Sequence, residues 1–330
     1  MSNITLYGAG AWGTALAVSL SKAHSVTLWA RDTHLVEHCL RQKENTNYLP
    51  NIALPPTLKL SANLASAAHN ADLHIIATPL AGFEEQLQQL KALGLKTPNI
   101  LWVCKGIAPK TGLLAHEIAR TVFPDHSAYG VLTGPSFALE VAQGLPTVLT
   151  LASEDAHFCT YWAQTLHQPR LRIYSTQDII GAEVGGAVKN VIAIAAGVSD
   201  GLGFGLNARA GLITRGLAET ARLAHALGAN RLTLMGLSGM GDLILTCTGA
   251  LSRNRTVGLE LAKGISLDKI LHNLGHVAEG VPTAQAVLLR ARQSGIEMPI
   301  CETVHSLLYE QRPAKDAVAA LLARDPQTES

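Results

Sequence analysis

The segment GAGAWG, residues 8–13, constrains the fold of this chain more than any other stretch. It follows the apolar run of residues 4–7 and opens a helix-like stretch, so it reads as strand, tight turn and helix. That order, with glycine at the first, third and sixth positions, is typical of a dinucleotide-binding βαβ unit. Gly8 allows the turn, Gly10 lets the backbone approach a pyrophosphate, and Gly13 lets helix and strand pack closely. The alternative is a purely structural strand-to-helix turn, but the context on both sides favours a dinucleotide site.

Composition agrees with a folded protein of about two domains. The chain has 330 residues, of which 48% are hydrophobic and 15% are charged, so core-forming side chains are plentiful. The formal net charge is +1, and neither a long basic run nor a long acidic run is present. We therefore expect no nucleic-acid partner and no electrostatic capture by a membrane surface.

Cysteine usage and the N-terminus both indicate a cytoplasmic protein. The five cysteines are odd in number and widely spaced, so they form neither a disulfide framework nor a CxxC metal pattern. The first residues enter a strand directly, without the basic and apolar regions of a secretory signal. No uncharged apolar stretch reaches the roughly 18 residues of a membrane span. We expect no metal site and no membrane insertion.

The first half of the chain alternates strand-like and helix-like segments. Helix-like segments, such as residues 83–93 and 113–121, separate short apolar runs that are typical of buried parallel strands. This alternation predicts an α/β fold, a Rossmann-type doubly wound sheet that binds ligands at the carboxyl ends of its strands. The five expected parallel strands, and two further strands closing the domain, are residues 4–7, 26–29, 73–77, 100–103, 129–132, 147–151 and 171–174.

Helical patterns dominate from residue 179 onward, where convincing strands are absent. We therefore expect an all-α C-terminal domain, with residues 1–180 binding the dinucleotide and residues 181–330 binding the substrate. The polar residues 325–330 are expected to fray. One apolar stripe at helical spacing should face the core of the second domain, namely Ile213, Leu217, Ala221, Ala224 and Leu227.

The end of the second expected strand bears on the choice of dinucleotide. NAD-binding units usually place an acidic residue there to hold the ribose 2′-hydroxyl. In this chain Arg31 comes first and Asp32 follows. A guanidinium can pair with a 2′-phosphate, so we favour NADPH as the cofactor, with NADH still possible through Asp32. The alternative is that Arg31 is a solvated loop residue.

Polar residues in apolar surroundings mark a possible substrate site. Each has a structural alternative, such as a loop lysine, a capped turn or a surface helix start. Lys189 is the hardest to explain in that way, because it lies in an apolar helix where burying a charge is costly. Taken together, these polar residues suggest a site for a small phosphorylated carbonyl compound. The candidate residues, with the small residues beside them, are Lys105, Gly134, Ser136, Lys189, Asn190, Asp242, Thr246, Ser252, Arg253 and Asn254.

Several long segments resemble the bacterial soluble NAD(P)-dependent glycerol-3-phosphate dehydrogenases. The matching stretches are GAGAWGTALA, VCKG, GPSFALE, GGAVKNVIAIAAGVSDGLGFG, NARAGLITRGLAE, GMGDLILTC, SRNR and VAEGVPTA. They cover most of the chain, and GGAVKN and SRNR are far more specific than the glycine pattern. The resemblance implies reversible reduction of dihydroxyacetone phosphate to sn-glycerol 3-phosphate, a precursor of phospholipids. It also implies a Rossmann domain followed by an all-α domain, and commonly a homodimer.

The resemblance also implies roles for individual residues. Lys189 would be the catalytic acid/base, and most of the polar residues given above would contact the substrate. Many relatives have serine where this chain has Ala11, so backbone N–H groups should bind the pyrophosphate alone. In addition to the three glycines, the residues that would contact the cofactor are Ala11, Trp12, Arg31, Lys105, Ala138, Arg253, Val277 and Glu279.

The chemistry is consistent with these roles. Hydride attack on a ketone places negative charge on its oxygen, and a positioned cation that also donates a proton lowers that barrier. Lys189 can supply the proton, Asp242 can orient it, and Arg253 is the best candidate for the substrate phosphate. Two alternatives remain open: a related β-hydroxyacid or 6-phosphogluconate-type dehydrogenase, and a dinucleotide sensor without catalytic activity.

Overall fold

The computed structural model describes residues 1–125, 128–275 and 277–322, so the polar residues 325–330 lie outside the described part. The chain divides into two compact units. Unit 1 comprises Met1–Lys105 and Leu114–Glu183, and unit 2 comprises Gly106–Leu113 and the chain from Val184 onward. The expected boundary after residue 180 and the observed division both fall within one helix, α8 (Ile179–Gly201). The short segment Gly106–Leu113 was not expected in the second unit.

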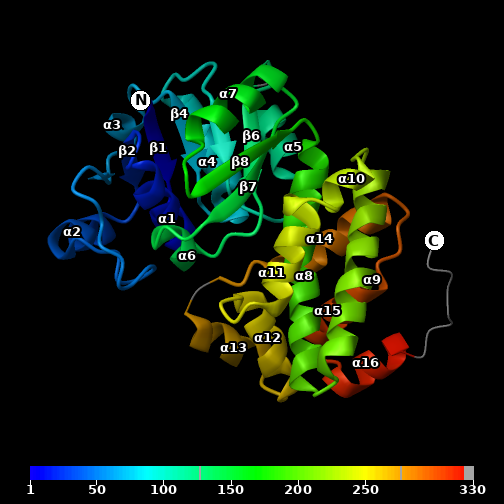
Figure 1. The fold of residues 1–330 in the computed structure, drawn as a ribbon. Helices are drawn as coiled ribbons and strands as arrows, with labels where there is room; N and C mark the ends of the chain where they lie inside the picture. Colours follow the sequence, from blue (N-terminus) through cyan, green and yellow to red (C-terminus); the bar gives the residue numbers. More distant parts are fainter. Residues whose placement is uncertain (126–127, 276, 323–330) are drawn as a thin grey trace. The chain divides into compact units, whose positions relative to one another are not determined.

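Unit 1 is built on a single eight-stranded sheet (Figure 1). The strand order is β3-β2-β1-β4-β5-β6-β7-β8, in which the first six strands have the order typical of a Rossmann fold. All neighbouring strands are parallel except β6 and β7. The strands are β1 (Asn3–Tyr7), β2 (Ser25–Trp29), β3 (Lys59–Ser61), β4 (Leu73–Ile76), β5 (Ile100–Trp102), β6 (Tyr129–Thr133), β7 (Thr147–Ala152) and β8 (Leu171–Thr176).

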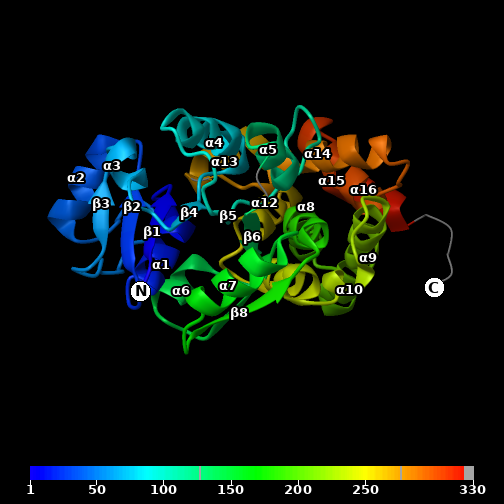
Figure 2. The same ribbon diagram turned by 90° about the horizontal axis from the view of Figure 1, so that it is seen from above.

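Helices cover both faces of this sheet, as the turned view in Figure 2 shows for α4 and α5 on one face and α1 and α6 on the other. Because both faces are covered, the central strands are almost entirely buried, as in Leu73–Ile76, where every residue is buried, His74 included. The helices are α1 (Ala11–Leu20), α2 (Thr33–Gln42), α3 (Leu64–Ala68), the 3₁₀ turn η1 (Leu80–Gly82), α4 (Phe83–Ala92), α5 (Ala115–Val122), α6 (Ala138–Ala142) and α7 (Ala156–Leu166).

The seven expected strands are confirmed, and the five expected to be parallel are parallel. One strand was missed. β3 has three residues, lies at the sheet edge, and contains only one apolar side chain, Leu60. The strand forms by pairing with β2, where Leu60 lies opposite Leu28. Three residues are too few to show an alternating hydrophobic pattern, so the sequence alone did not reveal it.

Unit 2 is helical: among residues 177–275 and 277–322 no strand occurs. This confirms the expected all-α character of the second half. The helices that follow α8 are α9 (Gly205–Ala226), α10 (Arg231–Leu234), the π-helical turn η2 (Leu237–Gly241), α11 (Asp242–Thr248), α12 (Arg253–Ala262), α13 (Leu267–Leu274), α14 (Gly280–Gln293), α15 (Pro299–Tyr309) and α16 (Ala314–Leu322).

Glycines allow α8 to pack backbone to backbone against its neighbours. A Cβ at Gly197 of α8 would lie 2.0 Å from the carbonyl oxygen of Arg255, and one at Gly258 of α12 would lie 2.0 Å from that of Ile194. We call this contact between Gly197 and Gly258 the α8–α12 seam. On another turn of α8, a Cβ at Gly185 would lie 2.5 Å from the carbonyl oxygen of Ser238 in η2. These glycines are required by close approach and not by backbone conformation.

The predicted apolar stripe on α9 is wrong in detail. Ala224 is buried, but the other four residues of that stripe are only half-buried. The buried face of α9 instead contains Gly216, Glu219, Thr220, Leu223 and Ala224. Gly216 packs against Ile192, so α8 and α9 run side by side, as Figure 1 shows. A hydrophobicity pattern does not identify this buried face, because it contains a glycine and a carboxylate.

Helix α8 also has the dimensions of a membrane span. Its 23 residues include a window of mean hydropathy 1.5, and a second candidate exists if the segments Arg231–Thr248 and Arg253–Ala262, bent by 47°, count as one span. However, 89% of the α8 window is buried within the protein. The helix therefore has the burial expected of a core helix, in which apolar side chains face other protein segments all round.

Candidate active site

The glycine turn after β1 has the geometry expected of a pyrophosphate cradle. Gly8 has a φ of +118°, and a Cβ there would lie 2.9 Å from the carbonyl group of Ala77. A Cβ at Gly13 would lie 2.0 Å from the carbonyl oxygen of Gly8, so the first turn of α1 can pack against this oxygen only with glycine at that position. At Gly10 a Cβ would meet no atom within 4 Å. Two glycines are thus required by the fold, whereas Gly10 borders open space that a phosphate can approach.

The first turn of α1 offers backbone N–H groups to that space. Ala11 and Trp12 begin the helix, the N-cap Gly10 provides no side-chain hydrogen bond, and no acidic residue lies in the first turn. Such a helix N-terminus binds anions through its N–H groups and its dipole. The residues present therefore fit a dinucleotide pyrophosphate.

Asn45 supports the glycine turn and was missed in the sequence. Its buried side-chain amide donates to the carbonyl oxygen of Ala9 and to the Thr14 hydroxyl, each at 2.8 Å. It thereby holds the turn from a loop more than thirty residues away. No motif or periodicity in the sequence marks Asn45, because only the fold brings it to the turn.

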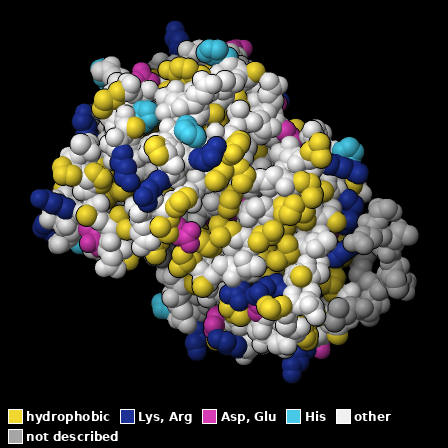
Figure 3. All heavy atoms as spheres, in the orientation of Figure 1, with side chains coloured by type: hydrophobic (Ala, Val, Ile, Leu, Met, Phe, Trp, Pro, Cys, Tyr) yellow, Lys and Arg dark blue, Asp and Glu magenta, His cyan; other side chains and the backbone are white. Residues whose placement is uncertain are grey.

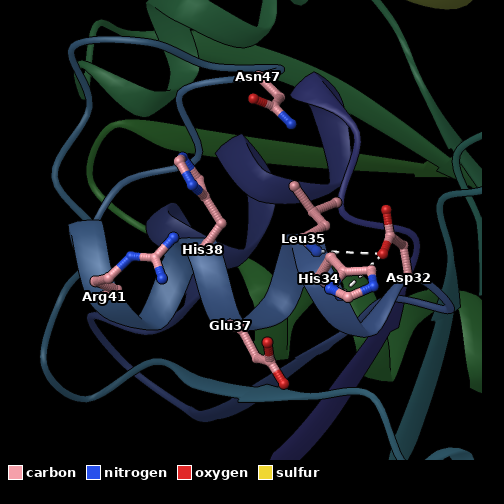
Figure 4. Close-up of a pocket in the computed structure, with 7 residues that line it drawn as sticks. All are labelled: Asp32, His34, Leu35, Glu37, His38, Arg41 and Asn47. Atoms are coloured by element: carbon pink, nitrogen blue, oxygen red, sulfur yellow. Dashed lines mark hydrogen bonds between the residues drawn. The ribbon is translucent and has the colours of Figure 1, made fainter.

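At the end of β2 the two residues proposed to choose the dinucleotide differ in their surroundings. Both residues are exposed, but the Asp32 carboxylate also caps α2 by accepting from the backbone N–H groups of His34 (2.9 Å) and Leu35 (3.3 Å). Figure 4 shows Asp32 at the rim of a surface pocket, with the basic side chains of α2 nearby. The pocket lining comprises Asp32, His34, Leu35, Glu37, His38, Arg41 and Asn47.

Three of the predicted substrate residues meet at the ends of β5 and β6. The Lys105 Nζ donates to the carbonyl oxygen of Gly134 at 3.3 Å, and the Ser136 hydroxyl donates to the same oxygen at 3.1 Å. Gly134 has a φ of +136°, so a side chain there would be strained. Ala138, a predicted cofactor contact, is the first residue of α6.

In unit 2, Lys189 lies in a buried polar cluster. Its ammonium group donates to the Asp242 carboxylate and, at 2.9 Å, to the Thr246 hydroxyl. That hydroxyl donates in turn to the Asp242 carbonyl oxygen at 2.6 Å, which leaves its lone pairs directed at the lysine. Lys189 is 7% exposed and Asp242 is 1% exposed, so the carboxylate offsets much of the cost of burying the ammonium.

The local structure around this cluster explains why the two partners meet Lys189. Asp242 begins α11 directly after the π-helical turn η2. The next residue after Thr246 is Cys247, whose pKa burial raises to about 12. That thiol therefore stays protonated, and it offers no thiolate nucleophile beside the lysine.

The predicted phosphate residues lie in the first turn of α12. Ser252 caps the helix by accepting from the Arg255 backbone N–H at 3.2 Å, and Arg253 is exposed. The Arg255 guanidinium donates to the Asp200 carboxylate at 2.7 and 2.9 Å, which anchors this turn to the end of α8. The resulting turn presents a solvent-accessible guanidinium on a fixed backbone.

The remaining predicted residues lie close to these in unit 2. Asn190 follows Lys189 on α8, and its side-chain oxygen accepts from the Asn254 amide at 2.9 Å. Val277 is exposed, and Glu279 is the half-buried N-cap of α14. Each unit therefore holds its own cluster of predicted residues: the glycine turn and the Lys105 group in unit 1, and the Lys189 and α12 groups in unit 2.

Comparisons with known proteins match both parts of the chain to one family. Residues 3–159 match the family model described as NAD-dependent glycerol-3-phosphate dehydrogenase N-terminus, and residues 178–319 match the corresponding C-terminus model. A protein named glycerol-3-phosphate dehydrogenase [NAD(P)+] from Aromatoleum aromaticum is 55% identical over 327 residues, covering 99% of both chains. One of the same name from Nitrosospira multiformis is 52% identical over 330 residues, with the same coverage.

A solved structure extends the agreement to three dimensions. The crystal structure of glycerol-3-phosphate dehydrogenase from Coxiella burnetii is 40% identical in sequence and superposes with a TM-score of 0.94. It covers 98% of this chain and 99% of its own. The protein described here therefore belongs to the NAD-dependent glycerol-3-phosphate dehydrogenase family.

Proposed function

We propose that this enzyme reversibly reduces dihydroxyacetone phosphate to sn-glycerol 3-phosphate with NAD(P)H and so supplies the backbone of glycerophospholipids. The observation that carries the proposal is the buried Lys189, held by Asp242 and Thr246, in a chain whose first unit carries a pyrophosphate cradle. Burying an ammonium costs free energy even when polar partners offset part of that cost, so its place in an apolar helix supports a functional role.

The two parts of the chain have different roles in this proposal. Residues 1–180 bind the dinucleotide, and residues 181–330 bind the substrate. Gly8, Gly10 and Gly13, with the N–H groups of Ala11 and Trp12, hold the pyrophosphate. Further cofactor contacts come from Arg31, Lys105, Ala138, Arg253, Val277 and Glu279.

Lys189 supplies the proton. When bound, the nicotinamide provides a hydride for the substrate C2 carbonyl carbon, so the carbonyl oxygen gains an electron pair. The Lys189 ammonium donates a proton to that oxygen and afterwards regains one from solvent. Asp242 and Thr246 hold the lysine in one orientation, so the ammonium need not reorganise as charge develops. In the reverse direction the neutral amine accepts the hydroxyl proton.

The substrate phosphate is bound by the first turn of α12. Arg253 supplies a guanidinium, and Ser252 and Asn254 supply hydrogen-bonding groups beside it. Lys105, Gly134, Ser136 and Asn190 complete the proposed substrate contacts. The exposure of Arg253 and the anchoring of this turn by Arg255 and Asp200 support this assignment.

We further propose that NADPH is preferred over NADH. The Asp32 carboxylate caps α2, so it accepts two backbone N–H groups already, whereas Arg31 is exposed at the end of β2. A guanidinium there can pair with a 2′-phosphate. We expect Arg31→Ala to raise the KM for NADPH about tenfold and the KM for NADH less, because one charge-assisted contact is lost. Equal increases for both cofactors would contradict the assignment.

We also propose a cytoplasmic homodimer. All five cysteines are buried and none forms a disulfide, as suits a reducing compartment. Unit 2 exposes large apolar side chains, including Leu206 (71%) and Leu232 (75%), and apolar side chains are numerous on the face drawn in Figure 3. Light scattering at micromolar concentration should give twice the chain mass of 34.9 kDa. A mass equal to one chain would refute the dimer.

The reaction is tested by NADPH oxidation with three substrates in parallel. Turnover is expected with dihydroxyacetone phosphate, but not with succinic semialdehyde or with the keto product of 6-phosphogluconate. Turnover with either of the latter would favour the β-hydroxyacid or 6-phosphogluconate-type alternative. NADPH binding without turnover of any substrate would favour a dinucleotide sensor.

A further inference from the structure

A short chain of hydrogen bonds links three helices of unit 2. The Asn254 side-chain amide of α12 donates to the side-chain oxygen of Asn190 in α8 at 2.9 Å. The backbone N–H of Gly280, the first residue of α14, donates to the Asn254 side-chain oxygen, also at 2.9 Å. Asn190 is 4% exposed and Asn254 is 9% exposed, so these bonds form largely without competition from water.

The two ends of this chain lie beside residues with different proposed partners. Asn190 directly follows Lys189, the proposed proton donor to the substrate. Gly280 directly follows Glu279, which we place against the dinucleotide together with Val277. The hydrogen bonds therefore connect the backbone next to a proposed cofactor contact with the side chain next to the proposed catalytic lysine.

Close packing explains why residue 280 is glycine. Its backbone does not have a positive φ, so conformation alone does not require glycine. However, a Cβ would lie 2.6 Å from the Asn190 carbonyl oxygen and 2.8 Å from the Asn254 side-chain oxygen. A side chain would push the first turn of α14 away from Asn254 and would lengthen or break the bond between them.

The hydrogen bond from Gly280 affects how the rest of the Asn254 side chain is directed. A carboxamide is planar and has one oxygen and two N–H donors. The oxygen is bound by Gly280 and one N–H by Asn190, so the second N–H is the donor that can reach a substrate phosphate. Because the group is rigid, the position of Gly280 sets the direction of that second N–H.

We propose that Gly280 is a positioning residue that couples the two ligands through Asn254: a dinucleotide held at Val277 and Glu279 fixes Gly280, which orients Asn254 toward the phosphorylated substrate. This inference rests on the proposed function, because it uses the cofactor contacts assigned there. Once one ligand has ordered the shared hydrogen bonds, the second ligand does not bear that ordering cost again. The coupling must be reciprocal, so each ligand tightens the binding of the other by the same factor.

The coupling can be measured with two ligands that do not react together. NADPH and sn-glycerol 3-phosphate are both reduced, so their ternary complex is stable. The NADPH dissociation constant, from its fluorescence, is determined with and without saturating sn-glycerol 3-phosphate. We expect the wild-type enzyme to bind NADPH about tenfold more tightly in the presence of sn-glycerol 3-phosphate. In Gly280→Ala we expect this ratio to fall close to one.

Gly211→Ala is the matched control. Gly211 is also a helical glycine of unit 2, but a Cβ there would meet no atom within 4 Å. We expect this variant to keep the wild-type ratio. Should Gly280→Ala fail to fold, Asn254→Ala serves in its place. If Asn254 made only a direct phosphate contact, its loss would weaken sn-glycerol 3-phosphate equally with and without NADPH and leave the ratio unchanged.

The outcomes separate this inference from the function on which it rests. A ratio near one in the wild-type enzyme, or a wild-type ratio in folded Gly280→Ala or Asn254→Ala, would overturn the coupling while turnover of dihydroxyacetone phosphate stayed intact. An enzyme that bound neither ligand, or turned over no triose phosphate, would instead overturn the proposed function and the coupling with it.

Discussion

At the scale of single residues, Lys189 shows how the surroundings of a side chain determine its chemical role. Lys189 is buried, and its ammonium group is held by a carboxylate and a hydroxyl from α11. We predict that Lys189→Ala lowers kcat by about 10³-fold, because the proton donor and the charge on it are both lost. The dissociation constant for NADPH should stay near the wild-type value, as measured by fluorescence titration.

A surface lysine provides the control for this prediction. Lys263 is the exposed C-cap of α12 and forms a surface ion pair with Glu260 at 2.7 Å. Lys263→Ala should have wild-type kcat. If Lys189→Ala retained wild-type turnover, Lys189 could not be the acid/base.

At the scale of elements, the turn between β1 and α1 contains one glycine needed for folding and another that we expect to matter for binding. A methyl group at Gly13 would collide with the Gly8 carbonyl oxygen, whereas one at Gly10 would face open space. We predict that Gly13→Ala lowers the free energy of unfolding by about 2 kcal/mol or more, because overpacking strains the turn. Gly10→Ala should unfold like the wild type but bind NADPH at least tenfold more weakly. Urea denaturation and NADPH titration of both variants test this; the reverse pattern would contradict it.

The contact between α9 and α15 predicts a pH-dependent stability. The Glu219 side chain accepts from the backbone N–H groups of Ile300 at 2.8 Å and Cys301 at 3.4 Å, so a residue of α9 caps α15. Burial is the largest influence on the pKa of Glu219 and raises it from 4.5 to about 7. A carboxyl group with a raised pKa stabilises the fold most below pH 4.5, and that stability is lost as the pH rises through 7.

The corresponding test compares Glu219→Gln with the wild type. We predict that the wild type loses roughly 3 kcal/mol of unfolding free energy between about pH 4.5 and 7.5 relative to Glu219→Gln, whose amide does not titrate. Urea denaturation across this range gives the difference. Parallel pH profiles for the two proteins would show that Glu219 titrates as it does in the unfolded chain.

The same elements show what the sequence could and could not predict. Glycine spacing and apolar runs predicted the β1 turn and seven strands, because those signals are local. The pattern on α9 failed because Glu219 is buried to cap a helix about eighty residues away, which no local periodicity encodes. Asn45 and Gly280 escaped notice for the same reason: their partners lie far along the chain. The clusters around Lys105 and Lys189 were predicted as separate segments, and the fold of each unit brings those segments together.

For the whole molecule, the start of α8 is an important anchor because this helix continues from unit 1 into unit 2. Within unit 1, the Glu183 carboxylate accepts from Trp102 Nε1 at 3.0 Å and from the backbone N–H of His116 at 3.0 Å. It also pairs with the His116 ring at 2.5 Å. Burial lowers the pKa of His116, but the hydrogen bond and charge of Glu183 outweigh it, so the pKa is raised overall.

We predict that His116→Ala lowers the free energy of unfolding by about 3 kcal/mol, because it leaves the buried Glu183 carboxylate without its ring partner. The loss should be largest below pH 6.5 and shrink as the pH rises, since a histidine with a raised pKa stabilises the fold in its protonated form. Denaturation followed by tryptophan fluorescence measures the effect. His225→Ala, an exposed site on α9, should change stability by less than about 0.5 kcal/mol. An equally small change in His116→Ala would rule out the anchor.

The α8–α12 seam has a consequence for the variation that this chain can tolerate. Gly197 and Gly258 lie within regular helices, where alanine normally improves stability by about 1 kcal/mol. At these two positions the opposite holds, since the added methyl group has no space between the two backbones. In a library that randomises every position, selection for folded protein alone should keep both glycines, and a design procedure guided by helix propensity would replace them and lose the fold.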